Sequence, residues 1–171
     1  MLTQEQLKEL LHYCPETGVW TWIVDRIGGI KKGDTAGNVM IKSGGKKYRR
    51  IKVMGGAIRA HRLAFLYMTG AFPEAEVDHE DGNGLNNCWS NIRAVTRADN
   101  AKNHRLRSCN SSGTSGVCWH KRYNKWQAII TVNGRKKALG YFTKKDDAVA
   151  ARKTAEIEFG YHPNHGTDRP L

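Results

Sequence analysis

The stretch from Val77 to His104 combines an acid, a histidine and several amides at spacings that suit phosphodiester hydrolysis. Asp78 and His79 are adjacent, Asn91 follows His79 by twelve residues, and Asn100 follows Asn91 by nine. Hydrolysis of a phosphodiester needs a hard cation, a base for the attacking water and closely fixed geometry. Asp78 and Asn100 can supply the oxygen ligands that hard cations prefer, and His79 titrates near neutrality and can take a proton from water.

Two strands and a helix are expected to bring these distant residues together. The Asp-His pair ends a stretch typical of a strand, and the segment RADNAKNH that contains Asn100 is typical of a helix. Upstream, AHRLAFLYMTG predicts a helix over residues 60–69, which Gly70 and Pro73 end. His61 within it is expected to be a packed helix residue.

The sequence VDHEDGNGLNNCWSNIRAVTRADNAKNH resembles the HNH nuclease motif, with its ββα-metal fold, in the form common among phage-encoded and homing endonucleases. The resemblance implies a divalent metal, Mg²⁺ or alternatively Mn²⁺, and DNA as the substrate. It implies His79 as the general base, Asp78 and Asn100 as the metal ligands, and Asn91 as the residue that steadies the loop and the histidine. Asn86 or Asn87 fits the loop. His104, four residues after Asn100, is an alternative ligand or a phosphate contact, so the ligand set stays open.

The residues before the motif predict a short helix followed by hairpins. Thr3 and Gln6 form a capping box for a helix ending near His12. Alternating β-branched and aromatic residues, broken by glycine pairs, predict hairpins over residues 18–58.

The residues after the motif predict a second, basic module. Residues 101–145 carry eleven Lys or Arg and no Asp or Glu, whereas residues 71–100 carry six acids and two bases. This uneven distribution of charge suits a protein in which the acidic segment binds a cation and the neighbouring basic segment binds phosphates. Three short strands with an Asn133-Gly134 turn and a helix starting at Thr143 with Asp146 in a capping box are expected.

This second module resembles the APETALA-type DNA-binding domain of plant transcription factors, which has a three-stranded sheet plus a helix and also occurs behind HNH nucleases in phages. The resemblance rests on Gly116-Val117, Trp126, Ala128, Gly134, Leu139-Gly140, Phe142 and the alanine-rich helix. It implies a sheet in the DNA major groove. The implied DNA contacts are His120, Lys121, Arg122, Gln127, Arg135 and Lys137. Arg105 and Arg107, in the preceding Ser/Asn/Gly segment, are expected to follow a groove.

Composition agrees with a nucleic-acid partner. The net charge is +12, and such an excess of positive charge commonly binds nucleic acid or anionic membrane. No apolar stretch approaches the roughly 20 residues that span a bilayer, and no export signal is expected. None of the four cysteines forms a CxxC pair, so neither a structural zinc site nor a disulfide framework is expected. The expected compartment is the cytoplasm, that of the host cell if a phage encodes the chain.

These observations predict an α+β protein of two modules. The predicted nuclease module is residues 1–104 with its motif at 77–104, the linker 105–112, the DNA-binding domain 113–160 and a loosely ordered tail 161–171, in which His162 and His165 are solvated. The predicted activity is metal-dependent, site-preferring hydrolysis of double-stranded DNA by a monomer that nicks one strand. The alternatives are a DNA-binding regulator built on an inactive nuclease and an RNA-directed nuclease.

Overall fold

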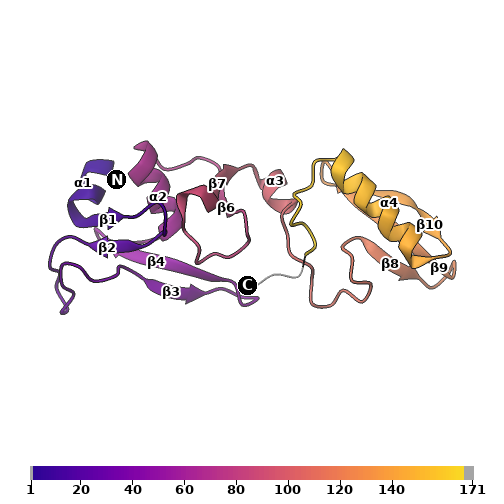
Figure 1. Cartoon of the computed structure of the whole chain (residues 1–171), viewed down its shortest axis with the longest axis horizontal. Helices are drawn as coiled ribbons and strands as arrows, with labels where there is room; N and C mark the ends of the chain where they lie inside the picture. The colour runs from indigo at the N-terminus through magenta and orange to yellow at the C-terminus, as the bar shows by residue number, and fades with distance from the viewer. Residues whose placement is uncertain (1, 168–171) are drawn as a thin grey trace. The chain divides into compact units, whose positions relative to one another are not determined.

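A computed structural model describes residues 2–167, whose helices and strands form a mixed α+β arrangement (Figure 1). The predicted α+β class is confirmed. The chain forms two compact units, of which the first ends at Val95 and the second begins at Thr96. The boundary predicted after His104 followed the sequence motif, whereas the packing divides that motif between its second strand and its helix. Within residues 2–167 no helix is long and apolar enough to cross a membrane.

The first unit is built from short antiparallel sheets and helices. Its strands pair as β1–β2, as β3–β4–β5 and as β6–β7. In chain order the elements are α1 (Gln4–Leu10), β1 (Leu11–Tyr13), β2 (Trp20–Trp22), β3 (Asn38–Ile41), β4 (Lys47–Val53), β5 (Gly56–Arg59), α2 (Ala60–Thr69), β6 (Glu76–His79), the 3-10 helix η1 (Trp89–Asn91) and β7 (Ile92–Val95).

Helix α1 has the predicted start and an earlier end. The capping box between Thr3 and Gln6 is present, with each side chain bonded to the backbone N–H of the other residue. Leu11 leaves the helix with extended backbone (φ −138°) and pairs with Trp22 in the β1–β2 hairpin. The predicted end near His12 was wrong because Leu11 buries its side chain equally well from a strand.

The hairpins and the second helix follow the sequence closely. Within the predicted range 18–58, β3 to β5 form two hairpins, whereas β2 pairs with β1, which precedes that range. Helix α2 covers the predicted residues 60–69. Gly70 ends α2 in the left-handed conformation (φ 82°), where its N–H bonds the carbonyl of Leu66. His61 is buried in α2, as predicted.

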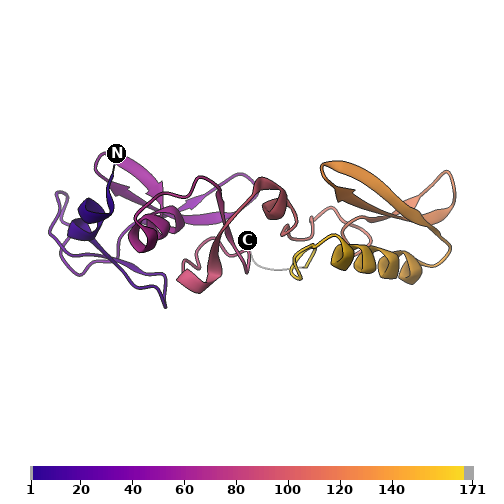
Figure 2. The same cartoon turned by 90° about the horizontal axis from the view of Figure 1, so that it is seen from above.

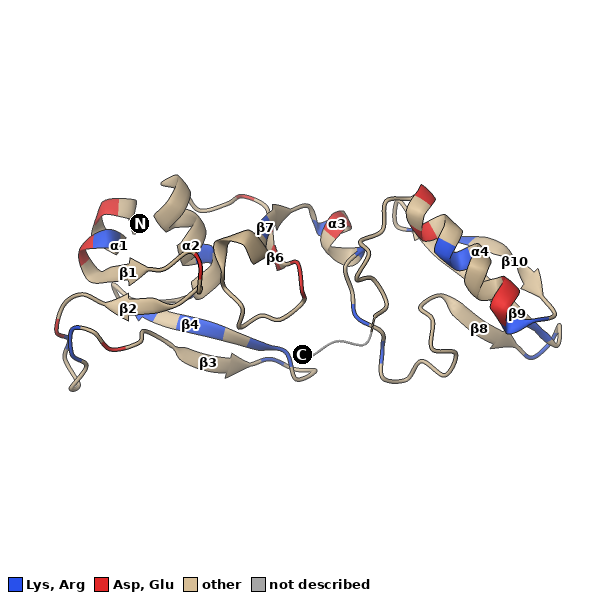
Figure 3. Cartoon of the chain, viewed as in Figure 1, with Lys and Arg blue, Asp and Glu red and all other residues tan. Residues whose placement is uncertain are grey.

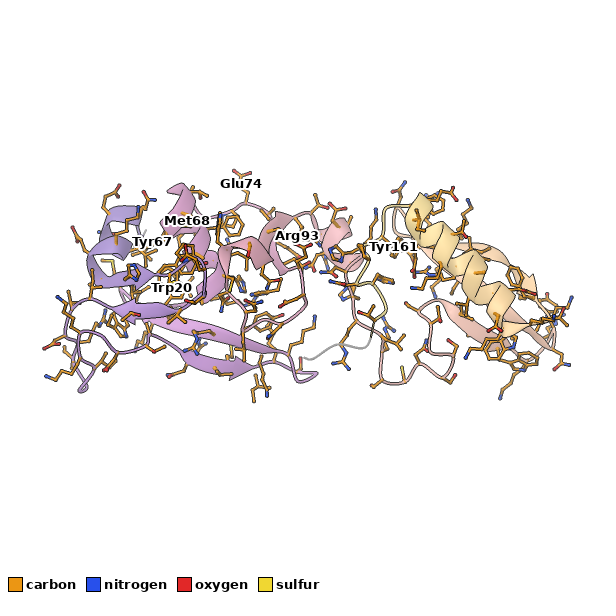
Figure 4. All side chains as sticks on the ribbon, in the orientation of Figure 1. Trp20, Tyr67, Met68, Glu74, Arg93 and Tyr161 are labelled. Atoms are coloured by element: carbon orange, nitrogen blue, oxygen red, sulfur yellow. The ribbon has the colours of Figure 1, made fainter. Side chains whose placement is uncertain are left out.

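The core of the first unit joins aromatic residues from several elements. Trp20 and Tyr67 lie close together (Figure 4), with ring centroids 5.6 Å apart and planes at 87°. Tyr13 packs on both rings, 4.8 Å from Trp20 and 5.8 Å from Tyr67. Two of these three contacts, Trp20–Tyr67 and Tyr13–Tyr67, are edge-to-face, and such contacts add stability beyond the buried area. They fix β1, β2 and α2 to one another, and Ile92 of β7 belongs to the same core.

The second unit contains the predicted three-stranded antiparallel sheet, in the order β10–β9–β8, and one long helix that lies along one face of it (Figure 2). Asn133 and Gly134 form the predicted turn, both with positive φ. Its elements are α3 (Arg97–Ala101), β8 (Val117–His120), β9 (Lys125–Val132), β10 (Arg135–Phe142) and α4 (Lys145–Glu158).

Helix α4 buries the expected small side chains and begins later than expected. Ala148 and Ala155 are buried against the sheet. The capping residue is Lys144, whose side chain makes no cap bond, so the predicted start at Thr143 was wrong. Asp146 and Asp147 still lie in the first turn, where negative charge is favourable.

The segments on either side of the sheet are more ordered than predicted. Backbone N–H groups of His162 and Gly166 bond the carbonyls of Lys102 and His104. His165 is only 7% exposed, with Nε2 3.3 Å from Nη2 of Arg152. The prediction of a loose tail with a solvated His165 was therefore wrong for the residues described, because buried Arg152 supplies a polar partner for the tail.

Candidate active site

His79 ends strand β6 and is held in the loop that follows it. It pairs with Ile92 of β7 across the two-stranded sheet and is 4% exposed. Its carbonyl accepts from Gly82, and the next residue, Glu80, donates its N–H to the carbonyl of Asn91. These bonds fold residues 80–91 back on the strand, so the loop lies against the histidine.

The ring of His79 contacts the side chain of Asn87. Nε2 of His79 lies 3.2 Å from Oδ1 of Asn87, and Nδ2 of Asn87 donates to the carbonyl of Leu85 at 3.0 Å. The second bond fixes which atom of the amide faces the histidine. Since Oδ1 only accepts, Nε2 carries the hydrogen and Nδ1 carries the lone pair. Nδ1 is thus the atom suited to take a proton from water.

Burial keeps His79 neutral. Desolvation lowers the pKa of His79 from its usual range, and the bond to Asn87 and the charges of Asp81 and Asp78 oppose that shift only in part. A general base must be unprotonated to act. The environment of His79 therefore favours the form that a base requires.

Two further rings pack around His79. The ring of His61, from α2, lies 4.9 Å away at 82°, and that of Tyr48, from β4, lies 6.1 Å away. Burial lowers the pKa of His61 to about 3, so His61 is neutral as well. The two rings confine the histidine between β4 and α2.

Asn91 ties the two halves of the loop together. Its Oδ1 accepts from the N–H of Asp81, and its Nδ2 donates to Oδ1 of Asp81 and to the carbonyl of Asn86. Asn86 in turn donates to Oδ2 of Asp81 at 2.8 Å. Both asparagines bind the same carboxylate, so Asp81, which the sequence analysis did not single out, is the centre of the loop.

Asp78 is engaged with a neighbouring strand. It lies opposite Arg93 in the β6–β7 register, and Nη2 of Arg93, labelled in Figure 4, is 3.3 Å from its Oδ2. The Asp78 side chain is 14% exposed. A carboxylate in this setting retains lone pairs that a hard cation can use.

Asn100 and His104 belong to the second compact unit. Asn100 lies on α3, which Thr96 caps by accepting from the N–H of Asp99 at 3.2 Å. His104 follows α3 and is exposed. The structure thus brings Asp78, His79 and Asn91 together in the first unit, while Asn100 and His104 lie in the other. No group of three or more His, Cys, Asp or Glu side chains within residues 2–167 forms a metal cage.

The predicted DNA contacts of the sheet lie on two faces. Cys118 and Tyr141 both pair with Gln127, which places them on one face, where His120 stacks on Tyr123 at 4.6 Å. The other face carries buried Val117, Ala128 and Ile130 under α4.

Lys137 and Arg135 belong to the helix-covered face. Lys137 pairs with Ile130, and its Nζ lies 5.0 Å from the ring of Phe159 at the end of α4. Arg135 pairs with Val132, two residues along the same face. The sheet residues that were predicted to contact DNA in one groove therefore lie on two different faces of the sheet.

The remaining predicted contacts lie in connecting segments. Lys121 and Arg122 are exposed in the β8–β9 turn. Arg107 is exposed, and Nε of Arg105 donates to the carbonyl of Leu106 at 3.4 Å.

Comparison with known proteins identifies the segment that contains this site. A family model described as HNH endonuclease matches residues 59–102. Residues 59–102 are thus similar to HNH endonucleases. The match starts at the end of β5 and includes α2, β6, β7 and α3, so every residue of the predicted motif up to Asn100 falls within it.

Two individual proteins resemble this chain. Protein 3.8 of Escherichia phage T7 is 31% identical over 80 residues, which is 46% of this chain and 66% of the phage protein. A solved structure, described as DNA binding and cleavage by the HNH homing endonuclease I-HmuI, is 23% identical, with 92% of this chain and 90% of that chain covered and a TM-score of 0.39. The family match ends at Lys102, so the resemblance of the C-terminal sheet to APETALA-type domains stays a prediction.

Several contacts of the site had no signal in the sequence. The sequence did not distinguish Asn86 from Asn87 as the loop residue. In the structure, Asn87 contacts His79 and Asn86 donates a hydrogen bond to Asp81. The hydroxyl of Tyr13 donates to the carbonyl of Asn87 at 2.6 Å from far along the chain. Only the tertiary fold brings Tyr13 and Tyr48 to this site.

Proposed function

We propose that this chain is a metal-dependent DNA endonuclease that hydrolyses phosphodiester bonds and nicks one strand. The observation that carries the proposal is the neutral, buried His79 of the HNH domain, whose Nε2 faces Asn87 so that Nδ1 holds the lone pair. A fixed lone pair on a neutral imidazole is what a general base for water needs. The match to the HNH endonuclease family supports the same reaction.

In the proposed reaction, Nδ1 of His79 takes a proton from the attacking water. The loop bonds of Asn91 and Asn87 hold the ring in place while it does so. Positioned general bases contribute about 10²–10⁴ in rate. Burial of His79 keeps it unprotonated before each turnover.

Asp78 and Asn100 are the proposed ligands of one divalent ion, with Mg²⁺ as the first choice and Mn²⁺ as the alternative. When bound there, such an ion would polarise the phosphate and stabilise the leaving oxygen. The carboxylate and amide oxygens of these two residues are the ligand types that hard cations prefer. His104 stays an alternative ligand. Arg93 neutralises part of the charge of Asp78, so Asp78 would bind the ion either in place of that guanidinium or together with it.

The second unit is proposed to supply most of the DNA affinity and the site preference. Its segment 101–145 has eleven Lys or Arg and no carboxylate, which suits phosphate contacts on double-stranded DNA. The open sheet face and the exposed β8–β9 turn are the proposed contact surfaces. The chain carries one Asp-His…Asn…Asn set. A single set cuts one bond at a time, and this supports a monomer that nicks.

The decisive experiment uses supercoiled plasmid with Mg²⁺ or with EDTA. The wild-type chain is expected to produce open circles only with Mg²⁺, with one protein per site by light scattering. His79→Ala is expected to lose cleavage and keep DNA binding, whereas His12→Ala, an exposed histidine of β1, keeps both. Binding of DNA without cleavage by the wild-type chain would favour the alternative, a regulator on an inactive nuclease. Linear product appearing as fast as circles from a two-protein complex would refute the nicking monomer.

Metal binding is tested separately by calorimetry with Mn²⁺. Asp78→Ala is expected to weaken Mn²⁺ binding and abolish cleavage, because it removes a charged oxygen ligand. Asp25→Ala is the control, because it loses only an exposed ion pair with Lys31 and an exposed hydrogen bond from the backbone N–H of Lys32. Unchanged Mn²⁺ affinity in Asp78→Ala would remove Asp78 from the ligand set.

A further inference from the structure

The first unit has a basic region of its own. Residues 35–73 contain eight Lys or Arg and no Asp or Glu. Figure 3 shows the blue of Lys and Arg along the ribbon of strand β4. Ile51 and Val53 of β4 turn into the core at 0% and 2% exposure. Since neighbouring strand residues alternate between faces, Tyr48, Arg50 and Lys52 lie together on the opposite face.

Two arginines meet directly on this face. Arg50 of β4 lies opposite Arg59 of β5 in the antiparallel register. Side chains at directly paired positions start about 5 Å apart, and like charges there are unfavourable. Among the ion pairs of residues 2–167, none involves Arg50 or Arg59. Within residues 2–167, these two directly paired arginines therefore have no carboxylate that neutralises either of them.

The arginine pair is connected to the candidate base through Tyr48. The guanidinium of Arg59 lies over the ring of Tyr48, 5.2 Å from its centroid, and that ring is 6.1 Å from the ring of His79. The motif loop also contacts β4, because a Cβ on Gly84 would lie 2.3 Å from the carbonyl oxygen of Lys47. The face of Arg50 and Arg59 is thus contiguous with the HNH site.

Other arginines near the site are already engaged with the protein. Arg62 donates to the carbonyl of Pro73, and Arg93 pairs with Asp78. Arg49 donates to the carbonyls of Ala36 and Gly37 from the other side of β4. Arg50 and Arg59 are the arginines of this sheet that have no such protein acceptor within the described chain.

We propose that Arg50 and Arg59 bind backbone phosphates of double-stranded DNA beside the HNH site. Guanidinium groups bind phosphate with paired, charge-assisted hydrogen bonds, and a phosphate between the two arginines relieves their repulsion. The duplex would then lie across β4 and β5 with its backbone leading to His79. The inference about cleavage rests on the proposed function, whereas the binding itself does not.

The test measures affinity of the full chain for a defined DNA duplex in EDTA, over a range of salt concentrations. Arg50→Gln/Arg59→Gln is compared with Lys31→Gln/Lys32→Gln, which removes two exposed charges elsewhere in the same unit. Each phosphate contact contributes about 0.9 to the slope of log affinity against log salt. The arginine variant is expected to lose about 1.8 from this slope, and the lysine variant much less. Arg50→Lys/Arg59→Lys, which keeps the charges, is expected to retain most of the slope.

Equal slopes for the arginine and lysine double variants would overturn the proposal. Arg50→Gln alone keeps the stacking of Arg59 on Tyr48, and its expected loss is about 0.9 in slope with a melting temperature no lower than that of the wild type. A wild-type chain that cuts no DNA would refute the proposed function, and the slope comparison would still decide the role of the arginine pair.

Discussion

The Nε2 atom of His79 lies 3.2 Å from the Oδ1 atom of Asn87, and this contact selects the ring nitrogen that can act as a base. Asn87 is 1% exposed and is itself held from two sides. The hydroxyl of Tyr13 donates to its carbonyl, and Gly18 approaches its backbone so closely that a Cβ there would be 2.3 Å from its carbonyl carbon. The β1–β2 hairpin therefore supports the orientation of the histidine from behind.

Replacing Asn87 is expected to impair cleavage more than it impairs DNA binding. Asn87→Leu keeps the volume and removes the acceptor, so the hydrogen of His79 is no longer fixed on Nε2. Loss of such an orienting partner typically costs about 10–100-fold in activity. Single-turnover cleavage measures the rate, and ¹⁵N NMR of the imidazole reports the tautomer directly.

The control for Asn87→Leu is Leu7→Ala, a cavity variant in the core beneath α1. It is expected to lower the free energy of unfolding while the folded fraction keeps the wild-type rate and tautomer. Equal rate losses in the two folded variants would show that Asn87 acts through stability alone.

Gly18→Ala is expected to damage the site through the backbone of Asn87. Gly18 has φ +69°, and alanine in this left-handed region costs about 1–2 kcal/mol. Gly28→Ala is a matched control, because Gly28 also has positive φ (91°) but has nothing within 4 Å of the added Cβ. Urea unfolding should show a larger loss for Gly18→Ala, and cleavage should fall only there. Similar losses of stability in both variants would mean that the loop yields to the added methyl group.

The sequence predicted those parts of the fold that local rules control. The capping box of Thr3, the end of α2 at Gly70 and the Asn133-Gly134 turn each depend on residues a few positions apart. Where a local signal competed with tertiary packing, packing decided. Leu11 continues the apolar pattern of a helix but pairs with Trp22, and the polar tail around His165 orders itself on buried Arg152.

The same distinction explains the site. The spacing of Asp78, His79 and Asn91 could be recognised because the residues lie in one short motif. Tyr48 and Tyr13 come from strands that only the tertiary fold brings there, so no spacing rule could predict them. The division of the sheet contacts between two faces likewise depends on the register of β10, whose bulge between Ala138 and Gly140 shifts the alternation.

The free energy of unfolding is expected to decrease as the pH is lowered, because His61 is buried. Its pKa is lowered from 6.5 to about 3 in the folded chain. Well above pH 6.5, His61 is neutral in both the folded and the unfolded chain, so its protonation does not affect the free energy of unfolding. As the pH falls below that value, only the unfolded form gains the proton, and the free energy of unfolding decreases by up to about 1.4 kcal/mol per pH unit.

Urea unfolding between about pH 6 and pH 5, above the range in which most carboxyl groups titrate, measures this dependence. His61→Phe fills the same space without a titrating nitrogen and is expected to make the slope shallower, whatever its effect on absolute stability. The slope that remains comes from His79 and His165, whose pKa values burial also lowers. His12→Phe, at an exposed position of β1, is expected to keep the wild-type slope. The same slope in His61→Phe as in the wild type would assign the pH dependence to other groups.

The two faces of the C-terminal sheet are expected to differ in their effect on DNA recognition. Gln127 lies on the open face, where its Nε2 donates to the hydroxyl of Tyr141 at 3.0 Å. This bond fixes the orientation of the Gln127 side chain, which we expect to contact a base of the DNA. Lys137 lies on the face covered by α4, beside the ring of Phe159.

Selection from a pool of random duplexes measures sequence preference without a known target. Gln127→Ala is expected to relax that preference at one position, at a cost of about 1–3 kcal/mol in affinity for the selected duplex. Lys137→Met removes a charge that points away from the open face, so it should leave the selected sequence unchanged. If Lys137→Met relaxed the preference and Gln127→Ala did not, the helix-covered side of the sheet would be the one that meets DNA, and the proposed binding surface would be wrong.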